Sequence, residues 1–193
     1  MAITHSFIVR YDQLEEGDDL TAVRGDLVPD CVMLGDFELT IDSVEFGEPN
    51  VELLGLAIGM FQAVTHVLAF GGDKSYSFAE CDLKLEITDS KDEQLVVAYV
   101  TSAGYWKKAY VDGLQMMRAA ARLLREVLAE TFDRHPQLLL NHSFLRSCPF
   151  AMHYARDARK GEFQTQDMCF YSSPDALRED MSGRVEVRRP SKA

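Results

Sequence analysis

The sequence lacks the features that mark secreted and membrane-spanning proteins. Its first ten residues carry neither a basic leader nor an apolar stretch, and polar side chains interrupt its longest apolar segment, residues 51–70. Only four cysteines occur in 193 residues, and they are widely separated: Cys31, Cys81, Cys148 and Cys169. We therefore expect reduced thiols rather than a disulfide framework, and a cytoplasmic location.

The sequence also lacks the short motifs of the common enzyme classes. It contains no glycine-rich phosphate loop, no paired-histidine metalloprotease helix, no nucleophile elbow and no closely spaced cysteine pair. Active sites assembled from distant residues leave no such motif. These absences therefore favour a binding protein over an enzyme without excluding an enzyme.

Positive charge is scarce in the first half of the chain. Residues 1–100 hold 20 Asp and Glu against 5 Lys and Arg, whereas residues 101–193 hold 11 against 15, which gives −15 and +4 and together the net charge of −11. An acidic field repels nucleic acid and acidic membranes and speeds encounter with basic proteins. The charge predicts a basic protein partner, and solubility is the alternative explanation.

Hydrophobic patterning predicts an α+β fold. The expected strands are residues 6–11, 37–46 and a hairpin of 81–87 with 95–100, and the expected main helices are 51–70 and 112–132, the second capped by Asp112 with Gln115. We predict a small antiparallel sheet packed against two main helices, with a less regular C-terminal segment that includes a short strand at 168–171. Residues 1–180 are expected to form one domain and residues 181–193 a mobile tail.

Five carboxylates surround the expected strand 37–46, and they form the first candidate site. They are Asp36, Glu38, Asp42, Glu45 and Glu48. Alternation places Glu38 and Asp42 on the solvated face of the strand, and the alternation slips near Ser43, where a bulge or the strand end is expected. These carboxylates could simply form a solvated acidic face that has no specific function. If they have one, contact with a basic partner is a simpler hypothesis than catalysis.

An aromatic cluster follows the expected hairpin. Tyr105, Trp106 and Tyr110 are flanked by Lys107 and Lys108. Aromatic rings beside positive charge stack on nucleic acid bases or anchor protein interfaces. Packing at the edge of the core is the alternative for Trp106, the only tryptophan. We include Trp106 among the predicted partner-binding residues.

Histidine and cysteine side chains gather in the C-terminal part of the sequence. The set is His135, His142, Cys148, His153 and Cys169. Imidazole and thiolate are the ligands that zinc prefers, but the spacings match no standard zinc finger. Ordinary helix-end and loop residues with buried thiols are the preferred explanation of the set. We predict no metal and no cofactor, and we keep a small metal-dependent enzyme as an alternative.

The order of the expected elements over residues 1–132 carries a family resemblance. Acidic strands, an apolar helix, a hairpin, the Tyr105–Trp106 pair and a long helix follow one another. In size, acidity and element order the chain resembles bacterial immunity proteins that neutralise polymorphic or contact-dependent toxins. The resemblance implies a stoichiometric inhibitor whose acidic face covers a basic toxin domain, and it carries over no individual residue. A self-associating subunit, with the apolar helix or the aromatic cluster in a dimer interface, is a further alternative.

Overall fold

The computed structural model describes residues 2–12, 19–78, 82–90 and 94–148, and it confirms the α+β fold class. One antiparallel sheet has the order β1 (Ile3–Tyr11), β2 (Leu34–Ile41), β3 (Val44–Glu52). The other has the order β4 (Asp73–Ser77), β5 (Lys84–Asp89), β6 (Gln94–Thr101), β7 (Gly104–Asp112). The main helices are α2 (Leu53–Phe70) and α3 (Gly113–Arg134), and the short ones are α1 (Val28–Cys31), the 3-10 helix η1 (Pro136–Leu140) and α4 (His142–Ser147).

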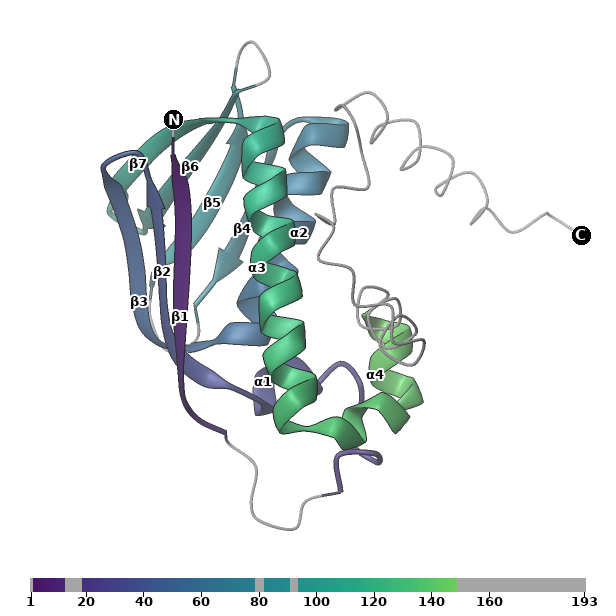
Figure 1. Ribbon diagram of the computed structural model, residues 1–193. Helices are drawn as coiled ribbons and strands as arrows, with labels where there is room; N and C mark the ends of the chain where they lie inside the picture. Colours follow the sequence, from purple (N-terminus) through teal and green to yellow (C-terminus); the bar gives the residue numbers. More distant parts are fainter. Residues whose placement is uncertain (1, 13–18, 79–81, 91–93, 149–193) are drawn as a thin grey trace, which may run out of the picture.

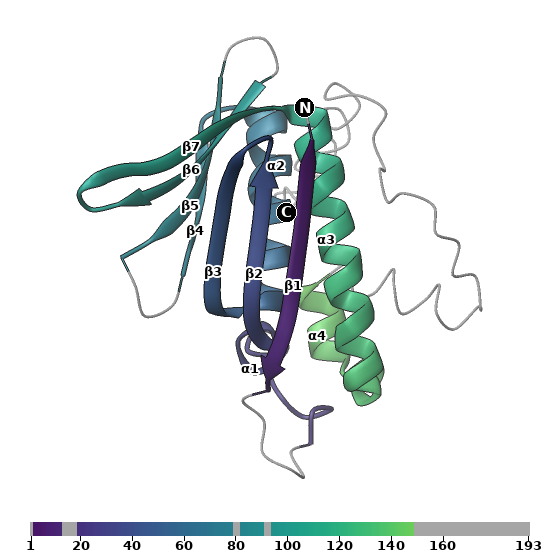
Figure 2. The ribbon, with the colours of Figure 1, turned by 60° about the vertical axis from the view of Figure 1, so that its left-hand side comes forward.

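The two sheets lie on the same side of helices α2 and α3, as Figures 1 and 2 show. Helix α2 contacts α3 and strands of both sheets, so it lies at the centre of the core. Its length and composition would also suit a membrane span, but most of it is buried inside the protein. An apolar helix without a polar face is explained here by burial against several elements.

Both main helices begin directly after a strand. Glu52 ends β3 and Leu53 begins α2, and Asp112 ends β7 and Gly113 begins α3. The Asp112 side chain accepts a hydrogen bond from the Gln115 backbone N–H at 2.8 Å, which confirms the predicted cap. An antiparallel sheet followed directly by a long helix thus occurs twice in the described part of the chain, with three strands before α2 and four before α3.

The expected strand 37–46 is wrong, because the structure divides it into two strands of a hairpin. Asp42 and Ser43 form the turn, and Ile41 pairs with Val44 across it. Asp42 has a φ of 52°, the left-handed conformation that two-residue hairpin turns require and that Asp tolerates. The slip in alternation at Ser43 therefore marks the strand end, one of the two predicted explanations, and not a bulge.

The predicted hairpin is confirmed as β5 and β6, which pair antiparallel from Lys84 with Val100 to Asp89 with Leu95. Cys81 lies outside the described residues. The aromatic segment after it is strand β7, which sequence reasoning left unassigned. The predicted strand 168–171, the tail 181–193 and the domain boundary at 180 also lie outside the described residues.

Candidate partner-binding surface

Strands β3 and β7, the end strands of the two sheets, lie next to each other. We call the line where they meet the seam. Beneath it, the ring of Phe46 packs edge-on against that of Tyr99 with centroids 5.2 Å apart, and Phe78 packs on the same tyrosine at 5.7 Å. Tyr99 is fully buried, so the seam rests on a rigid part of the core.

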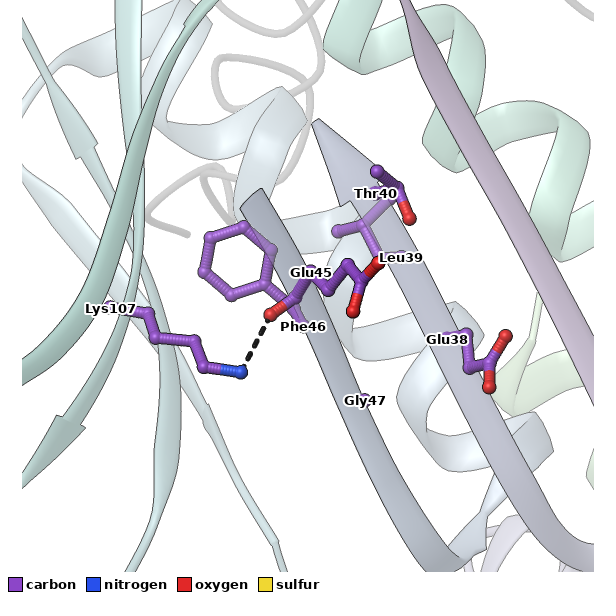
Figure 3. Close-up of a pocket in the computed structure, with 7 residues that line it drawn as sticks. All are labelled: Glu38, Leu39, Thr40, Glu45, Phe46, Gly47 and Lys107. Carbon is purple, nitrogen blue, oxygen red and sulfur yellow. Dashed lines mark hydrogen bonds between the residues drawn. The ribbon is translucent and has the colours of Figure 1, made fainter. Parts of the chain in front are cut away.

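A hollow of about 330 Å³ lies at the seam, and Figure 3 shows the residues that line it. Lys107 reaches from β7 to β3, where its Nζ donates a hydrogen bond to the Glu45 backbone carbonyl at 2.9 Å. Sequence reasoning placed Lys107 beside the aromatic cluster but did not predict its contact with Glu45, because nothing in the pattern places β7 beside β3. The lining residues are Glu38, Leu39, Thr40, Glu45, Phe46, Gly47 and Lys107.

Two of the five predicted carboxylates have structural partners. Asp36 accepts hydrogen bonds from Arg10 Nε at 2.9 Å and Nη2 at 2.5 Å, and these bonds hold the pKa of Asp36 below its ordinary value. Asp42 accepts the Ala2 backbone N–H at 2.9 Å, which ties the start of β1 to the hairpin turn. These two residues stabilise the first sheet, and they are the weaker candidates for partner contact.

Glu38 and Glu45 lie on the outer face of the first sheet, and both are exposed. They come from neighbouring strands: Glu38 pairs with Gly47, and Thr40 pairs with Glu45. Ser6 donates a hydrogen bond to Glu38 at 3.2 Å. Both glutamates line the hollow, so the structure brings this pair of predicted residues together.

Glu48 lies on the opposite face of β3. It pairs with the buried Phe37, and paired residues share a face of the sheet, so Glu48 is directed toward the core side of the seam. Partial burial raises the pKa of Glu48, and the nearby positive charge of Lys107 partly offsets this effect. The five carboxylates therefore do not form one contact group: Glu38 and Glu45 face outward, and Glu48 faces the seam.

The aromatic residues of β7 are unusually exposed. Tyr105, Trp106 and Tyr110 are 64%, 63% and 53% exposed. Trp106 also stacks on Tyr99 at 6.4 Å, so it lies at the rim of the core while showing most of its surface to solvent. Lys107 Nζ lies 5.1 Å from the Trp106 ring centroid, within the range of cation–π attraction.

The predicted metal-ligand set is only partly described. His135 follows the end of α3, with Nε2 3.3 Å from Asp12 Oδ1; His142 is exposed at the start of α4, and Cys148 is buried after its end. Within the described residues, no group of three His, Cys, Asp or Glu side chains could hold a metal ion. His153 and Cys169 lie outside them, so the alternative of a metal site formed by this set stays untested.

No protein-family model, curated protein or solved structure matches this chain. The resemblance to immunity proteins therefore stays a prediction.

Proposed function

We propose that this protein binds a basic protein partner in the cytoplasm and inhibits it stoichiometrically, in the manner of an immunity protein. The observation that carries the proposal is the position of the exposed Glu38 and Glu45 beside the exposed aromatic strand β7. The partner's basic surface would cover this part of the first sheet and the seam.

The carboxylates and the aromatic residues of this surface would contribute to binding in different ways. Carboxylates attract a basic partner over a distance, which raises the association rate and lowers affinity for acidic competitors. Exposed Trp and Tyr supply most of the energy in many interfaces, because they bury a large area at a small cost in side-chain entropy. Asp36 and Asp42 would add to the electrostatic field while keeping their structural partners.

The proposal predicts that a charge-reversal variant loses the partner. The tagged full chain, expressed in its native host, should retain a basic protein on an affinity column, and the double variant Glu38→Lys/Glu45→Lys should retain at least tenfold less. The matched control, Asp89→Lys/Asp133→Lys, changes the net charge equally at exposed positions outside the hollow. It should retain the partner nearly as well as the wild type.

Two results would contradict the proposal: retention of no basic protein, or equal loss with both double variants. Equal loss would mean that overall charge rather than this surface controls binding. A toxin gene adjacent to the gene for this chain would support inhibition independently, whereas metabolic neighbours would favour an enzyme.

A further inference from the structure

The chain places a cation of its own at the seam. The ammonium group of Lys107 is held by the Glu45 carbonyl at 2.9 Å and lies 5.1 Å from the centre of the Trp106 ring. Glu38 and Glu45 line the same hollow, and Glu48 is close enough for the charge of Lys107 to lower its pKa. An aromatic face and a carbonyl oxygen thus contact the ammonium group, the Glu48 carboxyl group lies near it, and each of these groups attracts a cation.

The ammonium group of a lysine interacts less favourably with these groups than a guanidinium group would. An ammonium is strongly hydrated and sits on a flexible stem, whereas a guanidinium is planar, less hydrated and stacks on an aromatic face. A guanidinium also donates hydrogen bonds along two parallel directions, so it can bind a carboxylate and a carbonyl oxygen at once. Trp106 offers an exposed ring for stacking, and the exposed carboxylates of Glu38 and Glu45 offer acceptors.

We propose that the seam is a pocket for an arginine side chain of the partner, which displaces Lys107 and stacks on Trp106. This inference depends on the proposed function for its partner but names a separate chemical feature. The displaced ammonium moves into water, and the guanidinium takes its place among the acceptors at the rim of the hollow. Lys107 is therefore a competitor that occupies the pocket in the free protein.

The charge balance of the pocket favours the exchange. Glu38, Glu45 and the cation Lys107 line the hollow, and Glu48 lies near Lys107 on the core side of the seam. Partial burial keeps the pKa of Glu48 above its ordinary value, so its ionised form gains when a cation is held close by. Binding of a guanidinium should thus be strengthened by the same carboxylates that attract the partner.

The only tryptophan of the chain reports directly on this pocket. We would titrate the purified full chain with the capped peptide Gly-Arg-Gly at millimolar concentrations while recording tryptophan emission. The same peptide with citrulline, a neutral isostere of arginine, is the matched control, and a lysine peptide tests the preference for a guanidinium. We expect a saturable change with arginine, a several-fold weaker affinity for lysine and no saturation with citrulline.

Two variants of Lys107 should move the affinity in opposite directions. Lys107→Ala removes the competitor, so the arginine peptide should bind several-fold more tightly. Lys107→Arg supplies a better competitor within the chain, so the peptide should bind several-fold more weakly. The inference is wrong if neither the wild type nor Lys107→Ala shows a saturable change with the arginine peptide. It is also wrong if the arginine and citrulline peptides give equal responses.

Failure of this pocket can be told apart from failure of the proposed function. If the captured partner is lost with Glu38→Lys/Glu45→Lys but is retained fully by Trp106→Leu and Lys107→Arg, the partner-binding surface stands and the arginine pocket is wrong. If the arginine peptide binds as predicted but no basic protein is captured, the pocket stands and the proposed function is wrong.

Discussion

Replacement of Asn141 by alanine is expected to lower the free energy of unfolding by about 3 kcal/mol or more. Asn141 is fully buried, and its Nδ2 donates hydrogen bonds to the Leu20 carbonyl at 2.7 Å and the Val23 carbonyl at 2.9 Å. Its Oδ1 accepts the Phe144 backbone N–H at 2.8 Å and so caps α4. Each buried group left without a partner costs about 1–3 kcal/mol, and loss of a cap costs about 1 kcal/mol.

The isosteric variant Asn141→Asp separates the donor role from the cap. It retains an acceptor for Phe144 but places a negative charge against two carbonyl oxygens, so its loss at neutral pH should equal or exceed that of alanine. Acidification should restore part of the lost stability, because a protonated carboxyl group can donate a hydrogen bond to one of the two carbonyl oxygens. Urea unfolding with an unchanged m-value measures both variants. Wild-type stability of Asn141→Asp at neutral pH would show that these hydrogen bonds do not support the fold.

Replacement of Gly35 by alanine should be similarly damaging. A Cβ at this position would lie 2.1 Å from the Ile8 carbonyl oxygen and 2.8 Å from Leu53 Cδ1. The first contact is with main chain, so no side-chain rotation relieves it, and β1 would have to move away from β2. Forced overpacking of this kind costs about 1–3 kcal/mol and occasionally more. We expect a loss of at least about 3 kcal/mol by urea unfolding.

Gly47 in the same sheet provides the matched control. A Cβ there would have its nearest neighbour, the Phe37 carbonyl oxygen, at 3.5 Å, an ordinary contact. Gly47→Ala should therefore change stability by less than about 1 kcal/mol, in either direction. Equal stabilities for Gly35→Ala and Gly47→Ala would show that β1 does not approach β2 as closely as described.

Patterning predicted those elements whose burial is regular. Strand β5 and helix α3 have periodic apolar faces, β6 is a continuous apolar run, and α2 is apolar throughout because it is buried on most sides. Strand β4 was missed because its sequence, Asp73 to Ser77, is polar and mostly exposed at a sheet edge. Strand β7 was missed because its apolar alternation is short: only Ala109 and Val111 are buried. The Asp42–Ser43 turn has no glycine or asparagine to mark it.

The candidate site was only partly predictable for a similar reason. The sequence identified the carboxylates around Glu38 and the aromatic cluster around Trp106 as separate features. It could not show that they meet, because the two sheets meet through tertiary packing between β3 and β7, which are more than 50 residues apart. The orientation of Glu48 depends on the Asp42–Ser43 reversal, because alternation along β3 after this turn places Val44, Phe46 and Glu48 on the inward face.

Hydrogen exchange of the chain with and without its purified partner tests the central claim most directly. We expect binding to slow amide exchange in β2, β3 and β7, the strands that carry Glu38, Glu45 and Trp106. Exchange in β4 and α4 should stay as in the free protein. If the partner protects β4 or α4 while β3 and β7 exchange as in the free protein, the partner does not bind at the seam.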